Sequence, residues 1–175
     1  MKRPLASLLF CFSWVFLLIF VSAGSSGELT DEQKLNRINE LYGRYKRSFS
    51  DAPDVSVKEL IAMRKEKDVV LVDRRERKEQ EVSMLPDAIT SEQFERDSES
   101  FKDKTIVVYC TIGNRSGYYA RELIQKGLNA YNLKGGILAW IHAKQKLVSR
   151  GKETRQVHVY GRRWNLAPKG YEAVW

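Results

Sequence analysis

Cysteine and histidine are scarce in this chain of 175 residues, which holds two of each. Two cysteines are too few for a disulfide framework, and two separated histidines are poor material for a zinc site. A glycine-rich nucleotide-binding loop is also missing. We therefore expect no metal and no cofactor. The composition, 43% hydrophobic and 30% charged, indicates an ordinary folded protein and excludes a disordered or fibrous chain.

An apolar run follows two basic residues at the N-terminus. It extends from Leu5 to Val21, interrupted by two serines, and small residues follow it from Ser22. This layout is typical of a secretory signal peptide, with cleavage expected after Ala23. The alternative is that residues 1–23 remain as a membrane anchor. The sequence thus predicts an exported protein that is periplasmic or secreted. If residues 1–23 are retained, they anchor the protein in a membrane with the rest of the chain on the exported side.

The rest of the chain is expected to have three parts. A capping box at 30–33 and apolar residues at helical spacing predict a helix over 31–47, so residues 24–50 form an N-terminal helical extension. Residues 51–148 form the central domain. Residues 149–175 form a basic C-terminal extension, which we interpret as an ordered tail on the surface rather than a nucleic-acid site, because an exported protein meets little nucleic acid.

Strand and helix patterns alternate in the central domain, which predicts an α/β fold. Continuous apolar strands are typical of a parallel sheet, and here we expect helices on both of its faces. The predicted strands are Asp68–Asp73, Thr105–Tyr109 and Ala130–Leu133, and the predicted helices are Val57–Met63, about Gly117–Lys126 and Ile137–Lys146.

The loop after the second of these strands carries the strongest chemical signal. With the signal peptide removed, Cys110 is the only thiol, and the loop from Cys110 to Arg115 joins a strand to the first turn of a helix. Backbone N–H groups can converge there on the sulfur or on an anion beside it, and Gly113 lets the backbone curl. Together with Arg115 they favour the thiolate, which is a nucleophile. The alternative is an inert buried cysteine.

Four segments between about Val55 and Val148 resemble the rhodanese family of sulfurtransferases. They are Val70–Glu76, similar to the family's strand ending in Asp-x-Arg-Glu; Leu85–Ile89, similar to its Ile-Pro-Gly-Ala segment; Cys110–Ser116, which reads Cys-x-x-Gly-x-Arg-Ser; and Leu133–Trp140, similar to its closing Gly-Gly-x-x-x-Trp motif.

This resemblance implies a rhodanese-like α/β fold with a parallel sheet of about five strands. It also implies that Cys110 takes sulfane sulfur from a donor, thiosulfate or polysulfide, and passes it as a persulfide to cyanide or a thiol, including a protein thiol. The loop residues that would bind the substrate and the persulfide are Thr111, Ile112, Gly113, Asn114, Arg115 and Ser116, with Arg115 holding an anionic donor, while Asp73 and Arg75 would belong to a supporting polar network. No nucleic-acid partner is implied.

Departures from the family pattern bear on the substrate. Thr111 replaces the basic residue that follows the cysteine in many thiosulfate-using members, and Met84 replaces a frequent histidine. Thr111 bears against thiosulfate as the natural donor, and Met84 removes any contribution of that histidine. The reaction class is less affected. Related phosphatases and arsenate reductases have a cysteine loop one residue longer, so the loop here favours sulfur over phosphate. The remaining alternative is a non-catalytic module that senses redox state or binds a partner through Cys110.

Aromatic and basic residues near the C-terminus suggest two further hypotheses. Trp140, Trp164 and Trp175 are interpreted as packing residues rather than a ligand box. Arg162 and Arg163 are expected to border the active-site entrance and to attract anionic donors.

Overall fold

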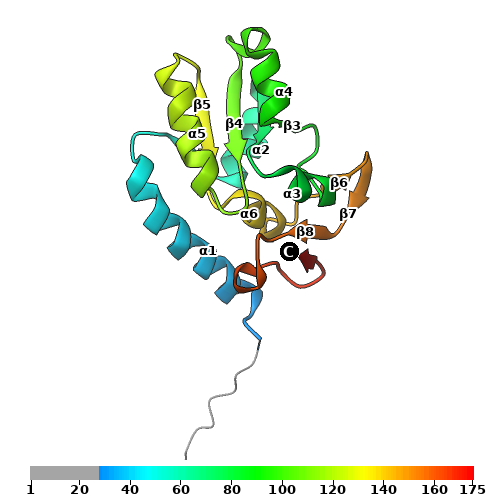
Figure 1. The fold of residues 1–175 in the computed structure, drawn as a ribbon. Coiled ribbons are helices and arrows are strands. Elements are labelled where there is room, and N and C mark those ends of the chain that lie inside the picture. The colour runs from blue at the N-terminus through cyan, green and yellow to red at the C-terminus, as the bar shows by residue number, and fades with distance from the viewer. Residues whose placement is uncertain (1–27) are drawn as a thin grey trace, which may run out of the picture.

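A computed structural model describes residues 28–175 of the chain (Figure 1). The predicted signal peptide or anchor, residues 1–23, lies outside the described residues, as does its expected cleavage after Ala23. Within residues 28–175, no helix has both the length and the apolar character needed to cross a membrane.

A five-stranded sheet forms the centre of the fold, with all strand pairs parallel and the order β1-β5-β4-β2-β3. The central strand β4 is buried at every residue, and Asp73 at the end of β2 lies opposite Tyr109 at the end of β4. This confirms the predicted parallel sheet. The strands are β1 (Asp54–Val55), β2 (Val69–Asp73), β3 (Ile89–Thr90), β4 (Thr105–Tyr109) and β5 (Ala130–Leu133).

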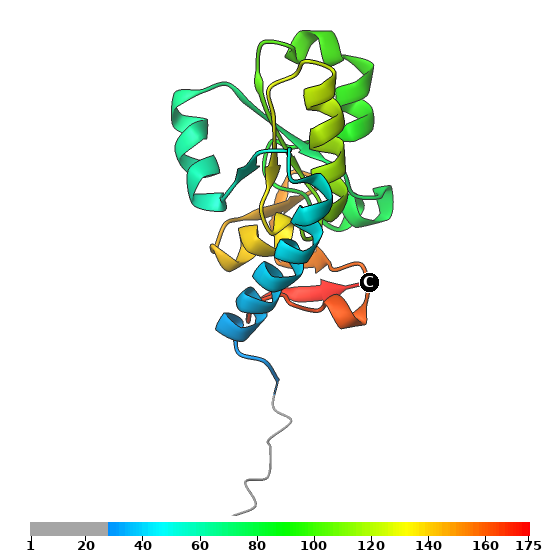
Figure 2. The ribbon, with the colours of Figure 1, turned by 90° about the vertical axis from the view of Figure 1, so that its left-hand side faces the viewer.

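Helices cover both faces of this sheet, as predicted (Figure 2). Because neighbouring residues of a strand face opposite sides, Val107 and Val108 belong to different cores. Val107 shares its core with α2 and α6, and Val108 shares the other with α4 and α5. The helices of the described chain are α1 (Asp31–Lys46), α2 (Val57–Glu66), α3 (Arg77–Val82), α4 (Ser91–Arg96), α5 (Asn114–Gln125) and α6 (Gly136–His142), with the short 3-10 helices η1 (Arg47–Phe49), η2 (Ser98–Phe101) and η3 (Arg162–Trp164).

Helix α1 forms where the capping box predicts it. The Thr30 hydroxyl accepts the Gln33 N–H at 3.2 Å, and the Gln33 side chain accepts the Thr30 N–H at 2.9 Å. Ile38 and Tyr42 are both buried, each in a different one of the two cores. The N-terminal helix is thereby fixed against the central domain.

Three predicted helix boundaries are wrong. Helix α2 ends at Glu66 rather than Met63. Helix α5 begins at Asn114 rather than Gly117, because Gly113 adopts a left-handed conformation (φ +96°) that turns the chain directly into the helix. Helix α6 ends at His142 rather than Lys146. There the chain turns at Lys144 (φ +58°), and the Trp140 indole donates to the Lys146 carbonyl at 2.8 Å.

The C-terminal part of the chain is ordered and contributes to the core. It forms two small sheets, the antiparallel pair β6 (Leu147–Ser149) and β7 (Lys152–Thr154), and the parallel pair β8 (Gln156–His158) and β9 (Glu172–Val174). Val157, Val159 and Leu166 are buried in the core that includes α6. Figures 1 and 2 show this part beside the N-terminal half of α1.

Trp140 is 3% exposed, so its predicted packing role is confirmed. The same prediction is wrong for Trp175, which is 54% exposed and lies beside the Arg162 guanidinium instead of in a core. Trp164 is half-buried, and it packs against the core while part of its ring lines the pocket described below.

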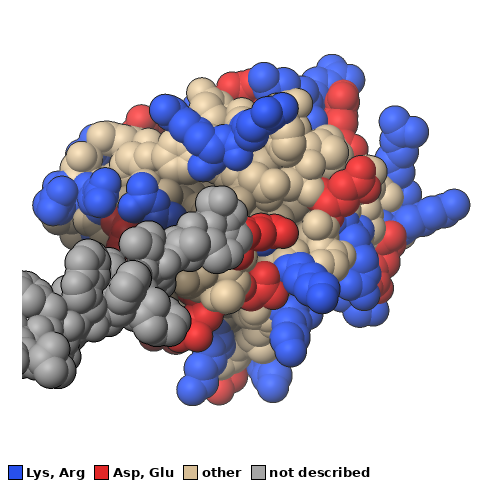
Figure 3. Space-filling model, turned by 90° about the horizontal axis from the view of Figure 1, so that it is seen from below, with Lys and Arg blue, Asp and Glu red and all other residues tan. Residues whose placement is uncertain are grey.

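Basic side chains are spread over the face seen in Figure 3, with acidic side chains between them. Ion pairs join a number of charged side chains of the described residues, as in Lys146 with Glu153 at 2.8 Å and Arg37 with Glu40 at 3.0 Å. These basic side chains are therefore neutralised locally by an acidic neighbour, while the net positive charge of the chain is unchanged.

Candidate active site

The cysteine loop lies at the carboxyl edge of the sheet, between β4 and α5. Gly113 donates its N–H to the Cys110 sulfur at 3.2 Å, so one loop amide meets the sulfur where the sequence predicts several. A side chain at Gly113 would collide with the Tyr42 ring at 2.6 Å. Glycine is thus required here by both the left-handed backbone and the packing of α1.

The first turn of α6 holds the backbone of the cysteine loop by hydrogen bonds. Ile137 donates its N–H to the Cys110 carbonyl at 2.9 Å, and Leu138 donates to the Thr111 carbonyl at 3.3 Å. A Cβ atom at Gly136 would overlap the Cys110 carbonyl oxygen. The Gly-Gly motif therefore lets α6 approach closely enough to fix the loop backbone.

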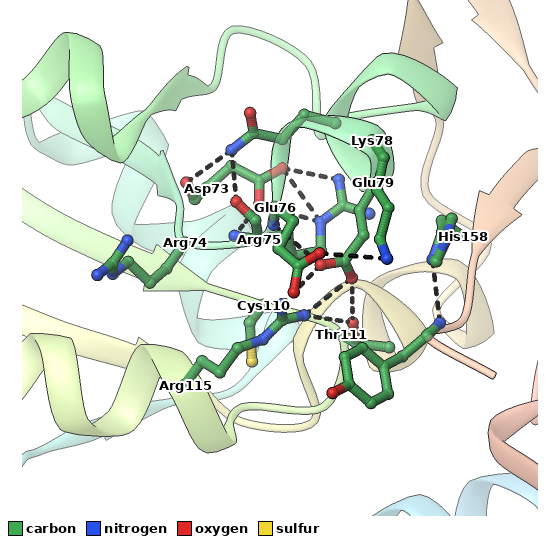
Figure 4. Close-up of polar contacts among 12 residues, drawn as sticks. Asp73, Arg74, Arg75, Glu76, Lys78, Glu79, Cys110, Thr111, Arg115 and His158 are labelled. Atoms are coloured by element: carbon green, nitrogen blue, oxygen red, sulfur yellow. Dashed lines mark hydrogen bonds and ion pairs between the residues drawn. The ribbon is translucent and has the colours of Figure 1, made fainter. Parts of the chain in front are cut away.

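Asp73 and Arg75 form a buried ion pair behind the loop (Figure 4). The Arg75 guanidinium donates to Asp73 at 2.7 Å, and both side chains are 0% exposed. The Tyr109 hydroxyl also donates to Asp73, at 2.6 Å, and accepts the Leu85 N–H at 3.1 Å. Burial first, and Asp73 second, raise the pKa of Tyr109 well above its ordinary value. This network joins the ends of β2 and β4 but does not line the cysteine pocket.

Glu79 on α3 is the main site residue that sequence reasoning missed. Its buried carboxylate accepts two hydrogen bonds from Arg115, at 2.6 and 2.8 Å, and one from the Thr111 hydroxyl at 3.0 Å (Figure 4). Burial alone would raise the pKa of Glu79, but the hydrogen bonds from Arg115 and from the Glu76 backbone outweigh it and hold the pKa below its usual range. In the sequence, Glu79 looks like one more charged residue of a polar helix.

The Arg115 guanidinium is therefore bound to Glu79, although the side chain remains partly exposed to solvent. Burial would lower the pKa of the guanidinium, but hydrogen bonding to Glu79 and the neighbouring Cys110 sulfur raise it, so the charge is permanent. Arg115 also donates to the Thr111 hydroxyl at 3.1 Å. The arginine closes the loop by joining its two ends to α3.

Ser116 lies away from the sulfur. Its hydroxyl donates to the Asn132 side-chain oxygen at 2.7 Å, and the Asn132 amide donates to the Gly113 carbonyl at 3.0 Å and to the Tyr42 hydroxyl at 3.0 Å. Ser116 therefore connects the loop to β5 through Asn132. The sequence instead predicts that Ser116 binds the substrate.

A pocket of about 200 Å³ opens at the loop. The predicted residues Cys110, Thr111, Ile112, Asn114 and Arg115 line it, together with Tyr45, Glu76, Tyr160 and Trp164. Sequence reasoning missed these last four, because they come from segments far from the loop. Arg162 and Arg163 do not line the pocket; their guanidinium groups lie over Trp175 and Trp164, at 5.8 and 5.4 Å from the ring centres. Trp164 lines the pocket, so Arg163 lies beside it, and the attraction of anionic donors by the two arginines stays a prediction.

Tyr160 is held over the loop by an unusual backbone. Its φ angle is +72°, a left-handed conformation uncommon for a tyrosine, and its N–H donates to Nδ1 of the buried His158 at 3.1 Å. Its ring lies 5.4 Å from the Arg115 guanidinium. His158 thus positions an aromatic wall of the pocket.

We expect the protein to lose stability as the pH falls below about 6.5, in part through His158. The pKa of His158 is lowered, mainly by burial and also by the positive charges of Lys78 and Arg75. The carboxylates of Glu79 and Glu76 oppose this shift but do not outweigh it. The unfolded chain therefore takes up the proton at a higher pH than the folded chain, and acid favours unfolding. Urea unfolding of the protein between pH 7.5 and 5 measures this.

The matched control is His158→Asn, whose side-chain oxygen can accept the Tyr160 N–H but does not titrate. This variant should show a smaller loss of stability over the same pH range. Equal pH dependence in the two proteins would contradict the assignment.

Comparison with known proteins places this chain in a family. The model of the rhodanese-like domain matches residues 56–143, which include the β2 end, the cysteine loop and the Gly-Gly turn. The chain belongs to the rhodanese-like domain family. The α/β fold of the chain agrees with this family. The thiosulfate sulfurtransferase of Pseudomonas aeruginosa superposes on it with a TM-score of 0.54 and 21% sequence identity, and the match covers 66% of this chain and 23% of that one.

Two relatives extend the comparison. A sulfurtransferase of Allochromatium vinosum is 42% identical over 77 residues, which are 42% of this chain and 72% of that protein. A tRNA sulfurtransferase of Desulfurococcus amylolyticus is 39% identical over 70 residues, 40% of this chain but only 14% of that protein. Membership of the rhodanese-like family and these relatives support a sulfurtransferase-type enzyme.

Proposed function

We propose that the protein transfers sulfane sulfur from a small donor to a thiophilic acceptor through a persulfide on Cys110. The observation that carries the proposal is the Cys110 sulfur at the base of a pocket, in contact with the Gly113 N–H at 3.2 Å. The loop around it is fixed by α6 and by the ion pair between Arg115 and Glu79. Such a fixed cradle orients a sulfur nucleophile and stabilises charge on the sulfur it carries.

The reaction divides into two displacements. In the first, the Cys110 thiolate attacks the outer sulfur of the donor, a new S–S bond forms, and the donor's own bond to that sulfur breaks. The electron pair leaves with the rest of the donor, as sulfite from thiosulfate or as a shortened polysulfide chain. In the second, cyanide or a thiolate attacks the outer sulfur of the persulfide, and the electron pair returns to Cys110. No external oxidant or reductant is needed.

A redox-sensing or partner-binding module is the alternative function. The thiol is only 1% exposed, which favours reaction with small molecules that enter the pocket over a mixed disulfide with a large partner. The two functions differ in turnover, because a sensor is oxidised once whereas a transferase returns to its starting state.

The test is steady-state thiocyanate formation from cyanide, with thiosulfate, polysulfide and organic thiosulfonates as donors. We expect the wild-type protein to turn over many times with at least one donor. Cys110→Ser, which keeps the size of the side chain but removes the sulfur, should reduce the rate to that of the uncatalysed mixture. Oxidation of Cys110 without thiocyanate, with every donor, would support the sensor instead.

A further inference from the structure

Three aromatic side chains that form the outer wall of the cysteine pocket come from outside residues 56–143, the part that matches the family. Tyr45 belongs to α1, and Tyr160 and Trp164 belong to the C-terminal extension. The floor of the pocket is therefore shared with the family, whereas its wall is built by the two extensions of this chain.

The charges around the pocket do not suit a dianion. The charged residues that line it are Glu76 and Arg115. Both outer nitrogens of the Arg115 guanidinium are bound to the Glu79 carboxylate, so its charge is compensated within the protein. Thr111, which follows the cysteine, adds no charge. Among the described residues that line the pocket, no cation is left without a carboxylate partner, and Arg163 lines an adjoining groove instead.

The size and lining of the pocket suit an apolar group. Its volume is about 200 Å³, and a cavity of roughly 150 Å³ lined by apolar side chains holds benzene. The rings of Tyr160 and Trp164 line it, each with a guanidinium 5.4 Å from its centre, Arg115 over Tyr160 and Arg163 over Trp164. Ile112 adds an aliphatic side chain. Aromatic rings prefer to pack against one another in offset or edge-on arrangements.

We propose that the sulfur donor carries an apolar group of about the size of a benzene ring on the sulfur atom to which its sulfane sulfur is bonded. The class is an organic thiosulfonate or organic persulfide with at most one negative charge, in preference to thiosulfate. Tyr45, Tyr160 and Trp164 determine this specificity. The proposal rests on the proposed function and names the substrate class of the same site.

The reaction with such a donor balances as in the general scheme. The Cys110 thiolate attacks the sulfane sulfur of an aryl thiosulfonate, and the bond between the two donor sulfurs breaks. The electron pair leaves on the sulfonyl group, which departs as a sulfinate, so the sulfonyl sulfur is reduced as the cysteine is oxidised to the persulfide. The aromatic wall holds the ring while its sulfur faces Cys110.

The test compares kcat/KM for benzenethiosulfonate, methanethiosulfonate and thiosulfate in the cyanide assay with the mature protein. The first two donors have the same charge and the same reacting group, so their ratio isolates the ring. We expect kcat/KM for benzenethiosulfonate to be about tenfold or more above kcat/KM for methanethiosulfonate. Tenfold is the low end of what one methylene contributes to kcat/KM in an apolar pocket. Thiosulfate should be the poorest donor of the three.

Variants of the wall assign this ratio to residues. Tyr160→Ala and Trp164→Ala should each lower the ratio at least about threefold, mainly through a higher KM for benzenethiosulfonate. Tyr160→Phe and Trp164→Phe, which keep a ring, should retain most of it. Trp175→Ala is the matched control, since Trp175 is an exposed aromatic residue of the same extension and does not line the pocket. Tyr160 is 56% exposed, so its replacement leaves the core intact.

The outcomes separate the two proposals. Equal kcat/KM for both thiosulfonates, thiosulfate as the best donor, or a ratio that Tyr160→Ala and Trp164→Ala leave unchanged would overturn the specificity and leave sulfur transfer in place. No sulfur transfer from any donor would overturn both.

Discussion

Replacing Asp73 with alanine is expected to lower the free energy of unfolding by about 3–5 kcal/mol, the cost of leaving a buried charge without its partner. Arg75 would lose its carboxylate in a site where both side chains are 0% exposed. Tyr109 would lose its acceptor as well. A single domain is commonly stable by only about 5–15 kcal/mol, so this variant should be close to unfolding at 37 °C. Urea unfolding followed by tryptophan fluorescence measures the loss.

Two controls distinguish the buried charge from other causes. Tyr109→Phe removes one hydroxyl of the same network and should cost about 1–2 kcal/mol. The double variant Asp73→Leu with Arg75→Met removes both charges and should recover a large part of the loss. If Asp73→Ala costs no more than Tyr109→Phe, the ion pair does not hold the ends of β2 and β4 together.

Replacing Glu79 with glutamine should weaken both the fold and the reaction. The change leaves the Arg115 guanidinium with a neutral partner, and because Arg115 is 31% exposed, solvent screens part of the effect. We therefore expect a loss of about 2 kcal/mol, below the range for fully buried pairs. Arg115 and Thr111 both depend on this carboxylate for their position, so persulfide formation should slow by about tenfold to a hundredfold.

Glu76→Gln is the matched control for this prediction. Glu76 also lines the pocket, but its ion pair with Lys78 is exposed and long, 3.3 Å. Its replacement should change stability by less than about 0.5 kcal/mol. Stopped-flow measurement of persulfide formation and urea unfolding of both variants give the comparison. Equal effects of the two substitutions would mean that Glu79 acts only as one more surface charge.

The part of the site that the sequence predicts correctly consists of segments that are adjacent in the chain. The strand Thr105–Tyr109, the loop from Cys110 and the following helix are adjacent in the chain, and apolar runs, a glycine and a helical pattern mark them in order. The parallel sheet follows from the same strands. The helix limits were less accurate, because the start of α5 depends on the φ angle of Gly113 and the end of α6 depends on a contact of Trp140.

The part that the sequence does not predict is long-range. Glu79 reaches Arg115 across 36 residues, and its burial depends on how α3 packs against the loop. The sequence predicts packing roles in the C-terminal extension for Tyr160 and Trp164, but not their place in the wall of the cysteine pocket, because that place depends on β8 and β9. No local pattern encodes such contacts, so the loop could be found from sequence whereas its pocket could not.

The most direct test of sulfur transfer is the intact mass of the protein before and after a thiosulfonate or polysulfide, with cyanide added last. The wild-type protein should gain the mass of one sulfur atom and lose it to cyanide with formation of thiocyanate, and Cys110→Ser should gain nothing. A wild-type protein that gains oxygen or a mixed disulfide but no sulfur from any donor would contradict the assignment of Cys110 as a sulfur carrier.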